Sequence, residues 1–331
     1  EMLNTRSLLK YFKRRSGNLS ATLEKSPIWL SLSNCVYENI SFEEYIYENV
    51  SLDVFDRILF IWRNTPSVVI GRHQNPWKEV NLKKIEQSNI KLCRRNSGGG
   101  AVYHDLGNVN FTVFSNRELY NRKENLNFVV EFFKEVYKIN LEINHKDDII
   151  FERFKVSGSA AKVGLNNAYH HFTLLCNANV NCLSEVLQNS FSQIQTSATQ
   201  SVSSPIKNLF YNGFDFADFV KNLTEFYHIK YKKISNYAQV HPINYPISHK
   251  VDLLKAWDWT YGKSPKFSVD GVLMKKGVQI GVINIVVQKG LISEIQSSSE
   301  YNEKLKYFVG IRFDPYKIIG LLKLYDVTIH F

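Results

Sequence analysis

Three consecutive glycines, Gly98, Gly99 and Gly100, restrict the fold of this chain more than any other feature of its sequence. The chain has only 16 glycines in 331 residues, and glycine loses more conformational freedom on folding than any other residue. A run of three therefore indicates backbone that another group must approach closely. Successive N–H groups in a glycine turn form a concave anion site, and the preceding Arg94 and Arg95 can add charged hydrogen bonds.

Taken alone, this segment has two interpretations, a phosphate-binding loop and a structural hairpin turn. It lacks the Gly-Lys-Ser/Thr ending of a P-loop and the spacing of a dinucleotide-binding fingerprint. The nature of the anion must therefore come from the rest of the sequence.

The composition narrows the class of protein. With 331 residues, 44% of them hydrophobic, the chain can bury a core and is long enough for two domains. No apolar run approaches the ~20 residues that span a bilayer, so we expect no integral membrane protein. The formal net charge of +10 favours an acidic partner, but the basic residues form no long stripe, which argues against a nucleic-acid module.

The cysteines and histidines give no sign of a metal site. The chain has four cysteines without Cys-x-x-Cys spacing: Cys35, Cys93, Cys176 and Cys182. They predict free or buried thiols in a reducing compartment. The adjacent His170 and His171 have no third ligand at a useful spacing, so we predict no metal site.

The first 26 residues combine basic, serine and apolar residues with few acidic ones. Between positions 6 and 26 the only acidic residue is Glu24, against six basic residues: Arg6, Lys10, Lys13, Arg14, Arg15 and Lys25. This composition is typical of a mitochondrial targeting segment, with a short surface helix as the alternative. We predict a targeting-like segment over 1–26 and a location in the mitochondrial matrix.

Hydrophobic periodicity predicts strands and helices in irregular alternation. Helical spacing predicts helices over 41–50, 75–89 and 123–140. Apolar, β-rich runs predict strands over 58–64, 67–71, 90–97, 107–115, 148–162 and 168–180. A polar stretch over 188–204 predicts a surface loop. This order favours a mixed α/β (α+β) sheet rather than a doubly wound parallel one.

The composition changes near 240–267, where two prolines precede a β-rich region over 268–296 and a helix-like segment over 303–310. We therefore predict a main domain over 27–250 and a small C-terminal α+β domain over 251–331.

Three segments after the glycine run carry side chains suited to chemistry. Lys155, beside a Ser-Gly-Ser turn, can pair with an anionic ligand or be a solvated surface charge. His170 and His171 are adjacent on a predicted strand, so their side chains face opposite sides of it. Asp148 can accept from an amine or cap a turn.

In order along the chain, these segments resemble the motifs of the lipoate–protein ligase and lipoyltransferase family. The similar segments, from about residue 30 to the C-terminus, are SVVIGRHQNPWKEVN, RRNSGGGAVYHDLGNVNFT, KVSGSAAK, HHFTLL and WDWTYGKSPKF. The resemblance implies a biotin/lipoate protein ligase-like catalytic domain over 27–250 with the small accessory domain after it. It also implies lipoyl adenylate (lipoyl-AMP), a mixed carboxylic–phosphoric anhydride, as substrate, and no tightly bound cofactor.

The same resemblance implies roles for individual residues. Lys155 matches the family's central lysine, which contacts the lipoyl carbonyl and the phosphate, and it is the predicted catalytic residue. Besides Lys155, the residues expected to bind the nucleotide are Arg95, Gly98, Gly99, Gly100, Ala101, Val102, Tyr103, Asn108 and Asp148. The residues expected at the lipoyl pocket are Arg72, His73, Asn75, Ser97 and His171.

Two departures separate this chain from the ATP-using ligases of the family. KDDI at 146–149 stands where ligases read RNDI, and the added charge of Asp147 is unfavourable for a polyphosphate. HHFT at 170–173 stands where ligases read HHGT, and we expect the bulky Phe172 to fill space beside the site. Both favour a lipoyltransferase that uses lipoyl-AMP or a lipoylated carrier protein. A complete ligase, needing ATP and Mg²⁺, is the alternative.

A second alternative is an octanoyl or lipoyl carrier transferase that works through a cysteine thioester, with Cys93 or Cys176 as nucleophile. A structural role for both cysteines is the favoured interpretation.

The resemblance also implies the acceptors. These are the lipoyl domains of 2-oxo acid dehydrogenase E2 subunits and the glycine cleavage H protein. Acidic surroundings of the acceptor lysine would suit the net charge of +10. We expect the chain to act as a monomer.

Overall fold

The computed structural model describes residues 26–52, 56–188, 191, 193–211, 213–232 and 236–331. Apart from Ser26, the predicted targeting segment lies outside these residues. The chain divides into two compact units. Unit 1 comprises the described residues of Glu1–Thr65, His104–Val180 and Ser204–Ser248, and unit 2 those of Pro66–Tyr103, Asn181–Ser203 and His249–Phe331.

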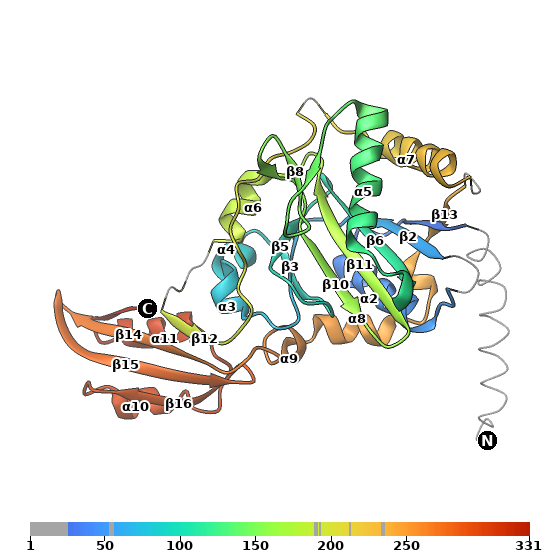
Figure 1. Ribbon diagram of the computed structural model, residues 1–331. Coiled ribbons are helices and arrows are strands. Elements are labelled where there is room, and N and C mark those ends of the chain that lie inside the picture. The colour runs from blue at the N-terminus through green and yellow to red at the C-terminus, as the bar shows by residue number, and fades with distance from the viewer. Residues whose placement is uncertain (1–25, 53–55, 189–190, 192, 212, 233–235) are drawn as a thin grey trace, which may run out of the picture. The chain divides into compact units, whose positions relative to one another are not determined.

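Unit 1 is built on a six-stranded mixed sheet (Figure 1). In sheet order its strands are β10 (Ser159–Val163), β11 (Asn167–Leu175), β6 (Asn108–Asn116), β2 (Arg57–Trp62), β1 (Ile28–Ser31) and β13 (Ala238–Val240). β1 pairs in parallel with β2 and β13, whereas the other neighbours are antiparallel. The predicted α+β fold class is confirmed by this mixed sheet.

Different helices cover the two faces of this sheet. Among its described residues, the main helices of unit 1 are α2 (Val36–Asn49), α5 (Arg122–Phe132) and α7 (Phe216–Tyr231). α5 and α7 lie together on one face (Figure 1), where Phe219 and Phe172 join the same core cluster. α2 covers the other face, where Phe42 meets Phe60 with ring centroids 5.4 Å apart. Alternation along the strands thus sends neighbouring residues to opposite faces.

Shorter elements complete unit 1. A separate three-stranded antiparallel sheet contains β7 (Glu142–Ile143), β8 (Ile149–Phe151) and β9 (Phe154–Lys155). Short 3-10 turns span Arg117–Leu119 and Pro242–Asn244, and a π-helical turn, Phe133–Tyr137, continues α5. The predicted helix over 123–140 is therefore helical through residue 137.

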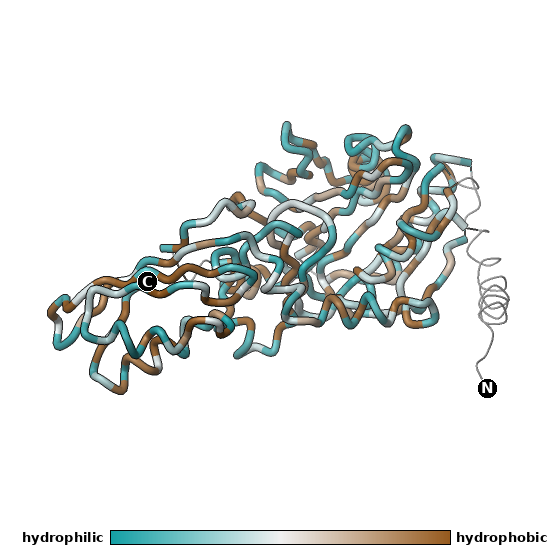
Figure 2. The backbone as a smooth tube through the Cα atoms, turned by 90° about the horizontal axis from the view of Figure 1, so that it is seen from below, coloured by the Kyte–Doolittle hydropathy of each residue, from teal (hydrophilic) through white to brown (hydrophobic). Residues whose placement is uncertain are grey.

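Unit 2 contains two sheets. The first has the order β4 (Lys91–Arg94), β3 (Ser67–Ile70) and β5 (Val102–His104), the last residue of which belongs to unit 1. The second is antiparallel and contains β12 (Ile194–Thr196), β14 (Phe267–Lys275), β15 (Val278–Gln288), β16 (Leu291–Ser297) and β17 (Val327–His330). Figure 2 shows long hydrophobic stretches along this second sheet, which form the core of the C-terminal part of unit 2.

The remaining helices in the described part of the chain are short. They are α3 (Pro76–Glu79), α4 (Leu82–Gln87), α6 (Val180–Val186), α8 (Ser248–Lys255), α9 (Trp257–Thr260), α10 (Asn302–Lys306) and α11 (Pro315–Lys323). Within the described residues, no helix is long and apolar enough to cross a membrane.

Two predicted elements differ from the structure. The single helix predicted over 75–89 is divided into α3 and α4, because Val80 is extended and Asn81 caps α4 by accepting from Lys84 N–H. The surface loop predicted over 188–204 is wrong in part, because Ile194–Thr196 pairs with β14. In addition, α7 and α11 have no counterpart among the predicted elements.

The predicted domain boundary after residue 250 lies two residues from the passage between units at Ser248/His249. Residues 66–103 and 181–203 nevertheless also belong to unit 2. Independent domains over 27–250 and 251–331 stay a prediction.

Candidate active site

The glycine run forms a loop of unit 2 between β4 and β5. Gly99 has a φ of 85°, a left-handed conformation that glycine adopts without steric cost. A side chain at Gly98 would meet no described atom within 4 Å, so the backbone there is open to an approaching group. Within the described part of the chain, the N–H groups of Gly98, Gly99 and Gly100 have no acceptor. The loop therefore offers three successive donors, an arrangement suited to an anion.

Two close approaches determine the path of this loop. A Cβ on Gly71, at the end of β3, would lie 2.1 Å from the carbonyl oxygen of Gly99. A Cβ on Gly100 would lie 3.0 Å from Ser201 Oγ. Gly71, the glycine of the GRHQN segment, therefore packs against the backbone of the glycine run.

Arg95 is buried inside the loop, with 4% of its surface exposed. Its guanidinium donates to the carbonyl oxygens of Gly98 and Gly100 at 2.5 and 2.8 Å, and to Ser97 Oγ at 3.0 Å. In a trans peptide the N–H and C=O groups point in opposite directions, so the N–H of Gly99 points away from Arg95. Arg95 shapes the loop in this structure, and its predicted contact with a nucleotide stays a prediction.

The expectation that Arg94 contacts an anion is wrong. Its side chain is fully buried, and burial lowers its pKa to about 10, which leaves it charged at neutral pH. The guanidinium donates to five carbonyl oxygens and one hydroxyl, those of Gly71, Arg72, Gln74, Trp259, Thr260 and Ser264. Arg94 therefore joins the GRHQN segment to the WDWTYGKS segment within unit 2.

The residues predicted for the lipoyl pocket belong to both units. In unit 2, Arg72 and His73 are exposed, and Ser97 is buried. Asn75 is fully buried and caps α3, since its Oδ1 accepts from Trp77 N–H at 3.0 Å. Its Nδ2 has no acceptor among the described residues, and a buried amide in that state marks a place where a ligand can supply one.

The residues that follow the glycine run have partners within the protein. Ala101 N–H donates to Ser201 Oγ at 2.9 Å. Tyr103 is buried and packs in a core cluster with Val68 and Ile70, whereas Val102 is half-buried. A contact between Tyr103 and a nucleotide is therefore restricted to its backbone.

In unit 1, Lys155 lies on β9 in a hairpin with β8. Its backbone pairs with Ile150 on one side and donates to Pro205 O at 2.9 Å on the other. Its Nζ is 2.8 Å from Asp148 Oδ1, and the two side chains are 26% and 11% exposed. The structure thus brings together two predicted nucleotide-binding residues as an ion pair with a partly exposed cation.

Asn108, at the start of β6, also belongs to the predicted nucleotide-binding set. The residue is fully buried, and its Nδ2 donates to Asn110 Oδ1 at 3.0 Å. Its Oδ1 has no donor among the residues that the structure describes. Like Asn75, it is a buried amide with one atom available to a ligand.

His171 faces α2 and takes part in a buried chain of hydrogen bonds. Its Nδ1 lies 2.9 Å from Glu43 Oε1, which also accepts from Thr112 Oγ1 at 2.7 Å. Trp62 Nε1 donates to Thr112 Oγ1 at 2.9 Å. The carboxylate holds the proton on Nδ1 and fixes the orientation of the imidazole.

His170 and Phe172 face α5, on the other side of β11. Asn125 Nδ2 lies 3.4 Å from His170 Nδ1, and Phe172 stacks on Phe111 with ring centroids 5.2 Å apart. The two histidines thus face opposite sides, as predicted. The expectation that Phe172 fills space beside the site is wrong, because alternation turns its ring away from His171 and into the core.

The two candidate nucleophiles are unsuited to a thioester mechanism. Cys93 and Cys176 are both fully buried. Burial also raises the pKa of the Cys176 thiol well above its ordinary value, so the reactive thiolate is disfavoured. Both cysteines have the environment of structural residues.

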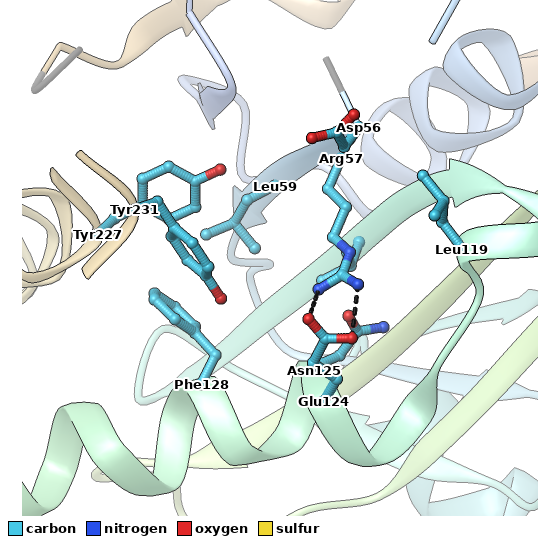
Figure 3. Close-up of a pocket in the computed structure, with 10 residues that line it drawn as sticks. Asp56, Arg57, Leu59, Leu119, Glu124, Asn125, Phe128, Tyr227 and Tyr231 are labelled. Atoms are coloured by element: carbon cyan, nitrogen blue, oxygen red, sulfur yellow. Dashed lines mark hydrogen bonds and ion pairs between the residues drawn. The ribbon is translucent and has the colours of Figure 1, made fainter. Parts of the chain in front are cut away.

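A separate cavity of about 370 Å³ opens in unit 1 between β2, α5 and α7 (Figure 3). Tyr227 and Tyr231 project into it from α7 and Phe128 from α5, beside the ion pair of Arg57 with Glu124. None of the predicted site residues lines it. In addition, no group of three or more His, Cys, Asp or Glu side chains in the described residues is arranged to hold a metal ion.

Sequence reasoning missed the polar residues that support these side chains: the buried Glu43, Gln74, Glu79, Asn110 and Thr112, and the exposed Ser201. The available signal was a carboxylate within an otherwise apolar helical pattern, as at Glu43, which is 1% exposed. Ser201 gave no such signal, because its partners lie about 100 residues or more away along the chain.

Comparison with known proteins identifies the family. Residues 35–227 match the family described as the lipoyl protein ligase A/B catalytic domain. The chain belongs to this family. It is 42% identical to the mitochondrial lipoyl amidotransferase LIPT1 of Mus musculus, over 72% of this chain and 66% of that protein. It is 38% identical to the Homo sapiens protein of the same name, over 81% of this chain and 74% of that protein.

Other similar proteins are named as ligases. The chain is 36% identical to lipoate-protein ligase A of Blochmanniella pennsylvanica, over 70% of each protein. Among solved structures, P. falciparum LipL1 in complex with lipoate has a TM-score of 0.62 and 28% identity, covering 89% of this chain and 93% of that one. A lipoate-protein ligase A bound with ATP has a TM-score of 0.58 at 20% identity and supports the fold alone. The chain is therefore an enzyme of the lipoyl amidotransferase and ligase family.

Proposed function

We propose that the chain is a lipoyltransferase, which moves the lipoyl group from lipoyl-AMP, or from a lipoylated carrier protein, to a lysine of a lipoyl domain. The observation that carries the proposal is the glycine run, which presents three N–H donors without an acceptor among the described residues. The similarity to two lipoyl amidotransferases supports the same reaction.

The chemistry requires stabilisation of negative charge rather than a protein nucleophile. The amine of the acceptor lysine attacks the lipoyl carbonyl carbon, a C–N bond forms, the C–O bond to phosphate breaks, and AMP leaves as the amine loses a proton. Charge develops on the carbonyl oxygen and on the departing phosphate. We assign Lys155 to the carbonyl oxygen and phosphate, with the glycine N–H groups as further phosphate donors. Fixed donors of this kind favour the transition state over the ground state.

Asp148 has a definite role in this scheme. Its carboxylate, 2.8 Å from Lys155 Nζ, accepts a charge-assisted hydrogen bond from the lysine and holds its side chain in place. An ammonium group carries three N–H donors, so one can bond to Asp148 while others remain directed at a ligand.

A transferase is preferred to a complete ligase because of Asp147. This residue has a φ of 58° in the turn directly before Asp148, and its carboxylate adds negative charge where ligases carry a neutral amide. Phe172 does not contribute to this preference, because its ring packs in the core. A complete ATP-dependent ligase is the second candidate, supported by 36% identity to a lipoate-protein ligase A.

For the acceptor, we propose lipoyl domains of 2-oxo acid dehydrogenase E2 subunits and the glycine cleavage H protein, met by a monomer in the mitochondrial matrix. Two of the similar proteins are mitochondrial. An archaeal lipoate protein ligase with the same fold was solved in a system that includes its E2 lipoyl domain. The net charge of +10 suits an acidic acceptor.

The test is an intact-mass assay of an apo lipoyl domain incubated with the purified chain. One tube receives lipoate, ATP and Mg²⁺, a second receives synthetic lipoyl adenylate, and a third receives a lipoylated carrier protein. We expect modification in the second or third tube and not in the first. Modification in the first tube would establish the ligase instead, and no modification in any tube would overturn the proposal.

Lys155→Ala tests the mechanism within the same assay. Transfer from lipoyl adenylate should fall at least about 100-fold, because the developing charge loses its fixed cation. Lys162→Ala is the matched control, since Lys162 is 28% exposed and paired with one carboxylate, that of Glu44. Lys162→Ala should transfer at nearly the wild-type rate, and an equally active Lys155→Ala would exclude the assigned role.

A further inference from the structure

A hydroxyl from the segment predicted as a surface loop is hydrogen-bonded to the residue that follows the glycine run. Ser201 Oγ accepts from Ala101 N–H at 2.9 Å and from Gln74 Nε2 at 3.0 Å, and it donates to the carboxylate of Glu79. One donor and two lone pairs are the full capacity of a serine hydroxyl, so every position is used. We call Gln74, Glu79, Ala101 and Ser201 the Ser201 network, and all four residues belong to unit 2.

The network is centred on a buried charge. Glu79 is 7% exposed, and its Oε2 accepts from Gln74 Nε2 at 2.8 Å and from Ser201 N–H at 2.9 Å, as well as from the Ser201 hydroxyl. Among the described residues, no lysine, arginine or histidine forms an ion pair with it. Hydrogen bonds alone therefore compensate a buried carboxylate, and such bonds are strong and geometrically demanding.

The network holds the glycine run at two points. Gln74 Oε1 accepts from Gly71 N–H at 2.8 Å, and Gly71 packs directly on the Gly99 carbonyl. Ser201 Oγ accepts from Ala101 N–H directly after the run, and it lies so close to Gly100 that a Cβ there would be 3.0 Å away. The three available N–H groups thus lie between anchored neighbours.

We propose that Ser201, held by Gln74 and Glu79, is a positioning residue that orients the N–H donors of the glycine run toward the phosphate of lipoyl adenylate. The inference rests on the proposed function, because it assigns those donors to that phosphate. Ser201 itself touches no reacting atom in this scheme. It acts through the backbone of Ala101 and Gly100.

The test compares steady-state transfer from lipoyl adenylate in wild type and Ser201→Ala. We expect KM for lipoyl adenylate to rise about tenfold with a smaller change in kcat, because phosphate contacts are made before as well as during the reaction. KM for the apo lipoyl domain should stay close to wild type, whereas the thermal midpoint should fall, because the buried Glu79 carboxylate loses one hydrogen bond. The control is Ser203→Ala, because Ser203 is a nearby exposed serine without a hydrogen bond in the described part of the chain.

A double-mutant cycle tests the geometry directly. Gly100→Ala alone places a Cβ 3.0 Å from Ser201 Oγ, so it should also raise KM for lipoyl adenylate. Once Ser201→Ala has removed that oxygen, adding Gly100→Ala should cost at most about twofold more. Gly99→Ala, where φ is 85°, should not be relieved by Ser201→Ala, because its strain is in the backbone.

The outcomes separate the two proposals. If wild type transfers and Ser201→Ala lowers only the thermal midpoint, or the two substitutions act additively, this inference is overturned and the proposed function stands. If wild type transfers from no donor, the proposed function is overturned and this inference with it.

Discussion

On the α2 face of β11, His171 is held in a chain of buried polar groups by Glu43. On the α5 face, one residue earlier and one later, His170 and Phe172 pack against Asn125 and Phe111. The motif HHFT, residues 170–173, therefore supplies a candidate site residue to one side of the sheet and core residues to the other. A residue that belongs to a sequence motif does not for that reason belong to the site. Side chains alternate between the two faces of a strand, and the face determines which residues each side chain contacts.

The largest expected change in stability comes from Phe172→Gly, which removes a buried ring from the α5 face. We expect the free energy of unfolding to fall by about 4 kcal/mol, since the substitution leaves a cavity and weakens the strand. Urea denaturation measures this loss. Phe111→Ala, which removes the stacking partner, should show a comparable loss.

Transfer from lipoyl adenylate at low temperature should change less than about threefold in Phe172→Gly, because the ring faces away from His171. Gain of ATP-dependent ligation without a loss of stability would show instead that Phe172 borders the site.

On the α2 face, His171→Ala should lower kcat/KM for lipoyl adenylate about tenfold to a hundredfold, as expected when a buried hydrogen-bonding group loses its partner. Steady-state kinetics at saturating acceptor measures this change. His170→Ala is the control on the opposite face, where the same residue type should leave kcat/KM near the wild-type value. Equal losses of kcat/KM in both variants would show that the two faces do not differ in function.

His170 predicts a pH effect on stability. Burial, with smaller contributions from the charges of Arg122 and His171, lowers its pKa from 6.5 to about 3. Between these values the unfolded chain binds a proton that the folded chain does not, so folded stability falls as the pH falls from 6.5 toward 3. The slope from this group is at most about 1.4 kcal/mol per pH unit.

Urea denaturation of wild type and His170→Gln at pH 7, 6 and 5 checks this prediction. The variant should have a shallower dependence of unfolding free energy on pH across that range. Parallel curves would mean that His170 is accessible to protons in the folded state.

The smallest expected change in unfolding free energy comes from an ion pair at the edge of the α5 face. Arg57 and Glu124 form two hydrogen bonds of 2.6 Å, but their side chains are 23% and 48% exposed (Figure 3). Glu124→Gln should therefore reduce the unfolding free energy by less than about 1 kcal/mol. The difference should shrink at high salt, which screens an exposed pair. A loss that is large and independent of salt would show that solvent does not reach this pair.

Much of the architecture was predictable because it depends on local pattern. Apolar, β-rich runs predicted the strands that became β2, β6 and β11, and their irregular alternation with helices indicated the mixed sheet. The helix over 75–89 was predicted wrongly as one piece, because the cap at Asn81 competes with a continuous apolar pattern. β12 was missed because its pairing with β14 joins residues more than 70 positions apart.

The candidate site was predictable in residue type and only partly in role. The glycines were singled out by their cost to folding, and their three available N–H groups agree with that reasoning. Arg94 and Arg95 looked equivalent in the sequence, yet one binds carbonyl groups of the WDWTYGKS segment and the other lies inside the loop. Their partners lie at other places in the sequence, so the local pattern could not distinguish the two arginines.

The sequence by itself determined the family, the mixed sheet, and the pairing of a glycine run with a downstream lysine, because these depend on residue type and spacing along the chain. The tertiary structure alone decided that Phe172 belongs to the core, that Arg94 binds buried carbonyl groups, and that Ser201 is hydrogen-bonded to Ala101 beside the glycine run. The physical reason is that hydrogen-bond partners and burial depend on groups far apart in sequence, whose proximity no local pattern encodes.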